Sequence, residues 1–530
     1  MSMTQRSLTP TVVLLLMAGT LYRLWPIAAG MPALGYFFIT EDGYLMLTVA
    51  RNIAIGNGMS VSEGTIATNG VQPLATFLFA IPYWITGGDK VTSLIGIHLI
   101  HAATALAAVF AIRALAARAL ATVAPGPVWP WAVALLWFLA PLLMRHSMNG
   151  LETSLYTLVL VLTLLSFARL LDRKDEATLI HRLQLGAMCG LAVLARNDAV
   201  FLVTSLFLVW TIWELFVLRR SLSTMLARLV PPGLFSIAVA APWLVSNQMN
   251  FGSIVPVSGA AQSQRAVFAE NITLIPVKLF EYVFPMLPIP GPLESNSWVI
   301  AVAGVGVGAA IVIFCLGLRR RGAPSDKAFL GAYLLFALAV SSYYGLFFGA
   351  GHFVSRYLAP LAPLLILAGV WAAFETGRLL VPRYPDVLAR TYVLSGGVLV
   401  AALLVRALLP GTTVQGHQQV ANWVAANVPE HAWVGAPQTG TLGYWHDRTL
   451  NLDGKVNPAA LAAKQTTGHV LDYVTDSDVD YIVDWAGVGN WVHFDIAQGP
   501  GAFAETFELI LQDKAANLSV QKRRTLRHTP

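Results

Sequence analysis

Residues 298–318 read WVIAVAGVGVGAAIVIFCLGL and are followed directly by Arg319, Arg320 and Arg321. An apolar helix of this length is about 30 Å long at 1.5 Å per residue, which matches the hydrocarbon core of a bilayer. Arginine clusters of this kind mark the cytoplasmic ends of membrane helices. The stretch therefore predicts a membrane-spanning helix that ends in the cytoplasm.

Similar apolar runs recur along the chain from Thr11 to Pro410. The sequence is 56% hydrophobic and only 12% charged, which leaves too little polar surface to cover a soluble protein. The predicted spans are residues 11–28, 91–112, 129–146, 151–171, 182–195, 198–218, 229–246, 298–318, 328–349, 356–376 and 390–410. Of these eleven segments, the one at 182–195 is short for a full span.

One further apolar segment, residues 72–86, does not fit as a span. If the first predicted helix runs outward and the helix at 91–112 runs inward, the segment between them cannot cross the membrane. It is also short and contains Pro73 and Pro82. We therefore predict a re-entrant or interfacial element, which is stable where protein or water satisfies its backbone.

Basic residues gather in clusters along the chain, and two apolar segments lie between each cluster and the next. The clusters are Arg113/Arg118, Arg173/Lys174/Arg182, Arg219/Arg220/Arg228, Arg319/Arg320/Arg321/Lys327 and Arg378/Arg383/Arg390. This pattern follows the positive-inside rule and accounts for the net charge of +6 without a nucleic-acid partner. It predicts a multi-pass protein of the bacterial inner (plasma) membrane, with the C-terminal part and the loops opposite the clusters on the outer side.

The last part of the chain, residues 411–530, has a different pattern. A helix-like run at 417–427 is followed by strand-like runs at 432–436 and 480–485, with turn signals between them. Alternation of this kind is typical of a small α/β domain. The predicted fold is thus an α-helical polytopic membrane domain at 1–410, with its first outer loop at 29–90, and a soluble extracytoplasmic α/β domain at 411–530.

Two adjacent carboxylates follow the first predicted span. Residues 37–44 read FFITEDGY, so Glu41 and Asp42 lie among aromatic and aliphatic side chains at the outer boundary. Low polarity and a neighbouring like charge both raise a carboxylate pKa, which suits a general base working near neutral pH. The alternative is structural: Asp42 is also a suitable N-cap for a helix at 44–55.

Several short motifs resemble, in order, those of the GT-C glycosyltransferases. EDGY at 41–44, ARN at 50–52, GNG at 56–58 and TNGVQPL at 68–74 resemble the first outer loop of protein O-mannosyltransferases, aminoarabinose transferases and mycobacterial arabinofuranosyltransferases. Three later segments resemble further motifs of this superfamily: GLET at 150–153, ARNDA at 195–199 and SRYLAP at 355–360. NLDG at 451–454 resembles a motif of the C-terminal domains.

This resemblance implies a sugar donor linked to a polyprenyl phosphate, an inverting displacement and a catalytic carboxylate in the first outer loop. The family often has Asp at the position of Glu41, so either carboxylate is a candidate base, and Asp42 is the preferred assignment. A sugar leaving a phosphate needs cations at the leaving group, and arginine binds phosphate through two donors. The candidate phosphate ligands are Arg196, Arg356, His352, Arg145 and His146.

Each of these cations also has a plainer interpretation. Arg196 can form a structural ion pair with Asp198, and Arg356 can lie at the membrane interface beside Tyr357. Arg145 and its neighbour can be ordinary interfacial residues. The sequence leaves these alternatives open.

The candidate substrate-binding residues are polar side chains in or near the same motifs and in the long outer loop at 247–296. They are Asn69, Gln72, Glu152, Asp198, Ser258 and Asp453. The long loop is rich in small and polar residues, which fits a mobile cover over a cavity as well as a plain linker. Glu152 can instead cap the next span, and Asp453 can belong to a plain turn.

The predicted function is transfer of a sugar from a polyprenyl-phosphate donor to an extracytoplasmic acceptor, which is a cell-envelope glycan, a lipid or a protein. The alternative is a transporter or flippase of lipid-linked sugars, although no internal duplication of the transporter type is visible. Cys189 and Cys315 both lie in apolar runs, and no zinc motif is present. No metal ligands are predicted, and a divalent cation is left open as a cofactor.

Overall fold

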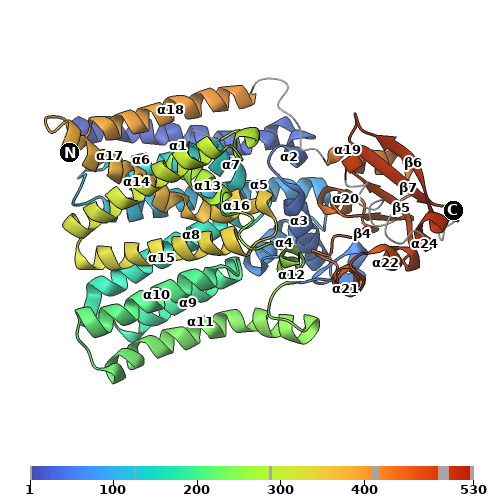
Figure 1. Ribbon diagram of the computed structural model, residues 1–530, viewed down its shortest axis with the longest axis horizontal. Coiled ribbons are helices and arrows are strands. Elements are labelled where there is room, and N and C mark those ends of the chain that lie inside the picture. Colours follow the sequence, from blue (N-terminus) through green and yellow to red (C-terminus); the bar gives the residue numbers. More distant parts are fainter. Residues whose placement is uncertain are drawn as a thin grey trace.

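The protein consists of a helical bundle and a smaller C-terminal domain built on a sheet, which lies at one end of the bundle (Figure 1). The computed structural model describes residues 3–124, 126–264, 266–285, 289–408, 417–487 and 501–525. The long helices run roughly parallel to one another (Figure 1). The bundle helices are α1 (Met3–Ala29), α5 (Lys90–Ala119), α6 (Val128–Leu139), α7 (Pro141–Ser147), α8 (Thr153–Arg173), α9 (Leu179–Ala195), α10 (Ala199–Ile212), α11 (Leu222–Phe251), α14 (Ser297–Arg321), α15 (Pro324–Leu346), α16 (Val354–Leu358), α17 (Ala362–Leu380) and α18 (Val387–Leu408).

The bundle is apolar on its outside as well as in its core. Trp298 and Val305 of α14 are 76% and 72% exposed, and Leu234 and Ile237 of α11 are more than half exposed. Apolar surface on this scale is not stable in water, so these faces contact lipid. Among the described residues, eight helices are long and apolar enough to cross a membrane, or nine if α6 and α7, which meet at 66°, form one broken span.

These helices confirm the prediction of a polytopic helical membrane protein. Each of the eleven predicted spans coincides with helix, but fewer than eleven meet the length and hydropathy criterion for a span. Helix α9 is too short, at 17 residues, as its sequence indicated. The predicted span at 390–410 corresponds to α18 and extends past the described residues.

The predicted non-crossing segment forms α4 (Pro73–Ile85), an apolar helix of 13 residues. It packs against α3 (Glu41–Ala54) and α5 through buried side chains that include Phe79 and Tyr83. Its other face is exposed, with Trp84 74% accessible. Helix α4 is therefore held by protein on one side and is too short to cross a bilayer on its own.

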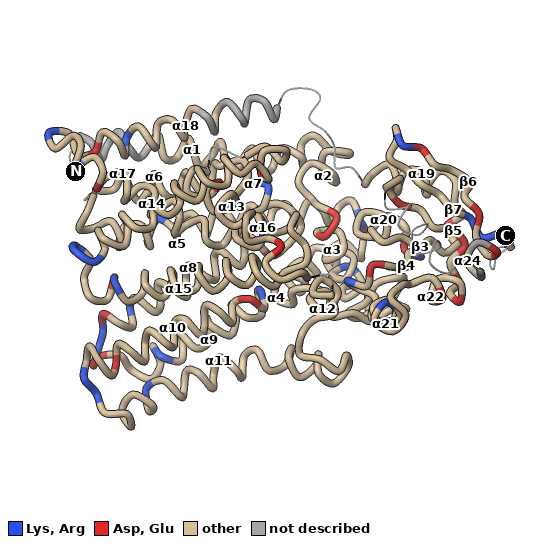
Figure 2. Tube along the Cα trace, viewed as in Figure 1, with Lys and Arg blue, Asp and Glu red and all other residues tan. Residues whose placement is uncertain are grey.

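The basic clusters of the bundle gather at the end opposite the C-terminal domain (Figure 2). They lie at the turns between bundle helices, where Arg118 pairs with Asp172 and Asp326, and Arg220 and Arg228 pair with the buried Glu214. The arrangement matches the alternation that the sequence predicted. The two ends of the bundle thus differ in charge, as the positive-inside rule requires of a membrane protein.

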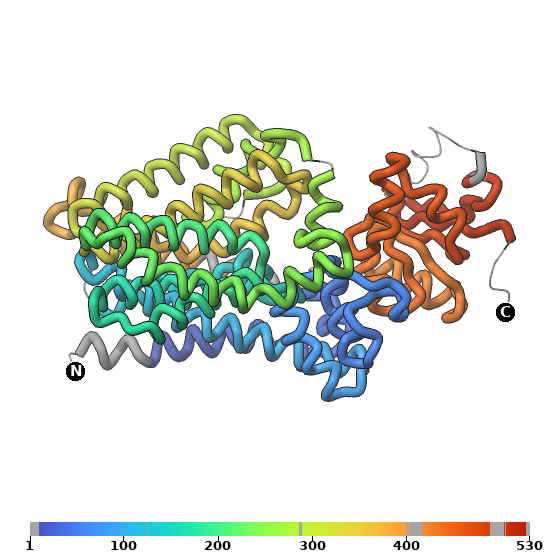
Figure 3. Tube along the Cα trace, turned by 90° about the horizontal axis from the view of Figure 1, so that it is seen from below, coloured from blue at the N-terminus to red at the C-terminus, as the bar shows by residue number. Residues whose placement is uncertain are grey.

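The first outer loop is folded rather than extended. It contains α2 (Ala33–Tyr36), α3, the short hairpin of β1 (Ser60–Val61) and β2 (Ile66–Ala67), and α4. Its core includes Tyr44, Leu47 and Val49 of α3. The loop lies between the bundle and the C-terminal domain (Figure 3).

A second long segment lies between α11 and α14. Helix α11 extends to Phe251, and Gly252 ends it in the left-handed conformation. Two helices form here, α12 (Val257–Ser263) and α13 (Leu274–Val283). Helix α13 packs against α14 and α17, and α12 reaches α21 of the C-terminal domain. The segment is therefore part of the packed structure and not a plain linker. Single turns of 3-10 or π-helix occur at Ser62–Gly64 (η1), Lys174–Glu176 (η2), Trp213–Val217 (η3), Gly291–Leu293 (η4), Gly351–Phe353 (η5) and Ala359–Leu361 (η6).

The C-terminal domain is α/β, as predicted, with a mixed five-stranded sheet in the order β4-β3-β5-β7-β6. Strands β4, β3 and β5 are parallel, and β7 and β6 continue the sheet in antiparallel fashion. The predicted domain boundary at 410/411 lies outside the described residues. The elements are α19 (Gln418–Asn427), β3 (Trp433–Ala436), α20 (Gly440–Trp445), β4 (Thr449–Asn451), α21 (Pro458–Thr467), α22 (Leu471–Asp476), β5 (Val479–Asp484), α24 (Gly501–Thr506), β6 (Phe507–Asp513) and β7 (Leu518–Arg523).

Candidate active site

A cavity of about 710 Å³ lies between the bundle and the C-terminal domain. Its walls come from segments far apart in sequence: the start of α3, the end of α7, the end of α12, the turn before α16 and the loops of the C-terminal domain. A volume of this size is in the range of small-molecule sites. Both domains are therefore needed to form the cavity.

The start of α3 is held at the cavity wall by a close contact between the backbones of Gly43 and Asn149. Thr40 is the N-cap of α3: its Oγ accepts a hydrogen bond from the Gly43 amide at 3.2 Å and donates one to the Asn149 carbonyl at 3.1 Å. A Cβ on Gly43 would lie 2.1 Å from that carbonyl oxygen, so only glycine fits. The interpretation of Asp42 as the N-cap is therefore wrong, and its side chain is left to face the cavity.

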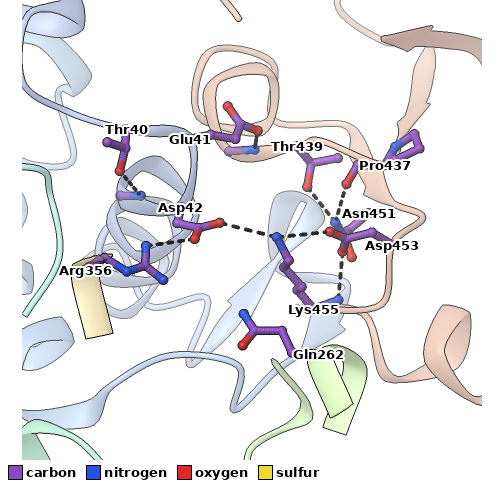
Figure 4. A network of polar contacts seen from close by, with 12 residues as sticks. Thr40, Glu41, Asp42, Gln262, Arg356, Pro437, Thr439, Asn451, Asp453 and Lys455 are labelled. Carbon is purple, nitrogen blue, oxygen red and sulfur yellow. Dashed lines mark hydrogen bonds and ion pairs between the residues drawn. The ribbon is translucent and has the colours of Figure 1, made fainter. Parts of the chain in front are cut away.

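Asp42 lies between two cations from different domains (Figure 4). Arg356 of α16 donates from Nη1 to Asp42 Oδ2 at 2.9 Å, and Lys455 of the C-terminal domain donates from Nζ to Oδ1 at 3.5 Å. Burial raises the pKa of Asp42, but the charges of Lys455 and Arg356 outweigh burial and lower it to about 2. The expected rise in the pKa of this carboxyl is thus wrong, because the sequence did not show that two cations lie beside it.

Glu41 has a different environment from its neighbour, because its side chain points toward α20 (Figure 4). Its carboxylate accepts hydrogen bonds from the Gly440 amide, from the Thr441 amide at 2.9 Å and from the Thr441 hydroxyl at 2.7 Å. His417 Nδ1 is 3.6 Å away. Glu41 therefore ties the first outer loop to the C-terminal domain.

Lys455 was not among the residues that the sequence singled out. It directly follows the NLDG motif, in which Gly454 has a φ of 88° and Asp453 accepts a hydrogen bond from the Lys455 amide. Its Nζ lies 3.6 Å from Asp453 Oδ2 and 5.0 Å from the ring centroid of Phe353. The sequence feature that could have identified Lys455 is its position directly after this motif.

The chain resembles solved membrane proteins over nearly its whole length. ArnT from Cupriavidus metallidurans, in a structure bound to undecaprenyl phosphate, matches with 12% identity and a TM-score of 0.56, over 97% of this chain and 98% of that one. An Archaeoglobus fulgidus oligosaccharyltransferase, tethered with an acceptor peptide, matches with 13% identity and a TM-score of 0.56, over 94% of this chain and 72% of that one. The chain has the GT-C fold.

The sequence comparisons are narrower. A family model described as a domain of unknown function, DUF8728, matches residues 407–524, which contain the described helices and strands of the C-terminal domain. No curated protein sequence matches the chain. The assignment of the GT-C fold thus rests on the three-dimensional arrangement.

Within this GT-C fold, Arg196 forms a buried cluster beside the cavity but does not line it. It is 2% exposed and pairs with Asp198, and its Nε lies 3.8 Å from Glu152 Oε1. Tyr357 separates this cluster from the cavity, since its ring centroid is 5.0 Å from the guanidinium carbons of both Arg196 and Arg356. The geometry favours the ion-pair interpretation of Arg196, and its role as a phosphate ligand stays a prediction.

The remaining predicted cations divide between the cavity and the surface. His146 and His352 line the cavity together with Arg356. The side chain of His146 lies near α16, with Nε2 3.1 Å from Ser355 Oγ. Arg145 has an exposed side chain that is not part of the cavity wall. Phosphate binding is thus better supported for His146, His352 and Arg356 than for Arg145.

The predicted polar substrate ligands divide in the same way. Asp453 lines the cavity. Asn69 is buried and accepts a hydrogen bond from the Val257 amide at 2.9 Å, so it anchors the start of α12. Gln72 precedes α4, and Ser258 lies in α12, both outside the cavity wall. Among the described residues, no group of three or more His, Cys, Asp or Glu side chains is arranged to hold a metal ion.

Proposed function

We propose that this protein is a glycosyltransferase that moves a sugar from a polyprenyl-phosphate donor to an acceptor outside the cytoplasm. The observation that carries the proposal is the position of Asp42 and Arg356, which face each other in the cavity of a GT-C fold. A carboxylate beside a guanidinium matches the two needs of sugar transfer from a phosphate, namely a base and a stabiliser of the leaving group.

In the proposed reaction, an acceptor hydroxyl attacks the anomeric carbon while the bond from that carbon to the phosphate oxygen breaks. The bonding electrons go to the phosphate, whose charge changes from −1 to −2, and the hydroxyl proton goes to Asp42. Arg356 presents a planar pair of donors that suits the increasing phosphate charge. His146 and His352, at the same wall, are placed to orient the donor. The displacement inverts the anomeric centre, because the acceptor attacks opposite the phosphate.

The membrane supplies one substrate. ArnT, which shares this fold, has a structure bound to undecaprenyl phosphate, which supports a polyprenyl-phosphate lipid as the donor carrier here. The basic clusters at the far end of the bundle support an outward-facing cavity (Figure 2). The acceptor is a glycan, a lipid or a protein of the cell envelope.

The test is complementation of cells that lack the protein, with the envelope glycans and glycolipids of each strain compared by mass spectrometry. Asp42→Asn keeps the size and polarity of the side chain but has negligible basicity, so we expect loss of the product by about 100-fold or more. Asp447→Asn is the matched control, because Asp447 also lies between two cations, Arg51 and Lys90 at 3.1 Å each, but outside the cavity wall. Wild-type product from the Asp42 variant would contradict the proposal and favour the transporter alternative.

A further inference from the structure

Two close backbone contacts position Lys455 opposite Asp42. A Cβ on Gly70 would lie 2.2 Å from the carbonyl oxygen of Lys455. A Cβ on Gly440 would lie 1.8 Å from the carbonyl oxygen of Glu41. Both approaches join the first outer loop to the C-terminal domain, so the position of the Lys455 side chain in the cavity is fixed by the docking of the two domains.

Lys455 is partly desolvated and surrounded by groups that keep it charged. Its side chain is 24% exposed, and the ring of Phe353 covers one side of the ammonium. Burial lowers the pKa of Lys455, but the nearby Asp42 and Asp453 more than compensate, so the pKa is raised above its ordinary value. The group is thus a permanent cation that points into the cavity from the domain opposite Arg356.

On the basis of the proposed function, we infer that Lys455 is a second ligand of the donor phosphate, and that the phosphate displaces Asp42 from its two cations and so prepares Asp42 to act as the base. The donor phosphate has the same single negative charge as Asp42 and offers two non-bridging oxygens to the two cations. It becomes the stronger competitor as the sugar leaves, because its charge then rises to −2 and it presents three acceptor oxygens. Both cations are within reach of a single anion, since each already contacts Asp42.

The exchange of cations from Asp42 to the phosphate explains how Asp42 can become basic enough to act. A carboxylate with a pKa of about 2 is a weak base near neutral pH. When Arg356 and Lys455 turn to the phosphate, the effect of burial on Asp42 is no longer outweighed, and its pKa rises. The other titratable side chains at the cavity are Glu41, His146, His352, His417, Asp453 and Lys464. The site would thus have a competent base only when the donor is bound, which protects the cavity from unproductive proton transfer.

The experiment measures binding of undecaprenyl phosphate alone to the purified full-length protein in detergent, by native mass spectrometry. We expect Lys455→Gln to weaken binding by about 10- to 100-fold, the effect of losing one charged hydrogen bond. Lys455→Arg should recover part of this loss. Lys522→Gln is the control, since Lys522 belongs to the same domain but lies on β7 and not in the cavity wall.

The decisive variant is Asp42→Asn. If Asp42 competes with the phosphate for Lys455 and Arg356, removing its charge should tighten binding, and Lys455→Gln in the same chain should remove most of that gain. A merely structural role for Asp42 predicts weaker or unchanged binding of the Asp42→Asn variant instead. Binding of the Lys455→Gln variant at the level of the control, or no tightening by Asp42→Asn, would overturn the inference while the proposed function stands. A wild-type protein that binds no undecaprenyl phosphate would overturn both.

Discussion

Glu41 and Asp42 are neighbours in the chain but face different partners, because successive side chains of a helix are turned by about 100°. Asp42 faces two cations in the cavity, and Glu41 faces backbone amides of α20. Charge alone does not distinguish them. We therefore propose Asp42 as the base and a docking role for Glu41.

Glu41→Gln tests this docking role. A glutamine keeps one acceptor oxygen but presents an NH₂ group where Glu41 now accepts hydrogen bonds from Gly440 and Thr441, so we expect a loss of about 1–3 kcal/mol at this contact. The apparent melting temperature in detergent should fall, and transfer should be slowed but not abolished. Glu63→Gln is the control, because the Glu63–Arg448 pair also joins the first outer loop to the C-terminal domain but is exposed, and such pairs contribute little. Equal melting temperatures for the two variants would argue against the docking role.

At the scale of elements, α20 lies against α3 with almost no space between their backbones. Gly440, at the start of α20, makes this approach possible, whereas Gly443, one turn later, has its nearest neighbours 3.7 Å from a built Cβ. The two glycines belong to the same short helix but meet different constraints. Their alanine variants therefore separate steric contact from helix propensity.

We expect Gly440→Ala to displace the C-terminal domain from α3, since the new methyl group would overlap the Glu41 carbonyl. The melting temperature should fall, and limited proteolysis should release the domain more readily. Gly443→Ala should be neutral or stabilising by up to about 1 kcal/mol, because alanine favours helix more than glycine does. If both variants resist proteolysis as well as wild type does, the close contact between α3 and α20 is not what holds the domain.

At the scale of the whole molecule, the prediction concerns orientation in the membrane. The C-terminal domain and the basic clusters lie at opposite ends of the bundle (Figure 2), and the positive-inside rule then predicts that the domain lies outside. Single cysteines at the exposed positions Thr467 and Ser253 should react with a membrane-impermeant thiol reagent in intact cells. A cysteine at the exposed Ala323 should react only after the cells are permeabilised. The reverse pattern would place the cavity in the cytoplasm.

The sequence by itself determined the helical membrane class, the α/β character of the C-terminal part and the acidic pair of the first outer loop. These features are local: the length of an apolar run, the alternation of strand and helix signals, and two adjacent carboxylates are all visible in a short window. The charge alternation along the chain likewise predicted which end of the bundle carries the basic residues, because each cluster lies at the end of an apolar run.

Only the tertiary structure decided what each charged side chain does. The two cations on Asp42 come from α16 and from the C-terminal domain, hundreds of positions away in the chain, so no local pattern linked them to it. The same contacts reversed the expected pKa shift of Asp42, because a pKa depends on neighbours in space rather than in sequence. Arg196, by contrast, had its partner two residues away, and there the sequence named the ion pair that the structure contains.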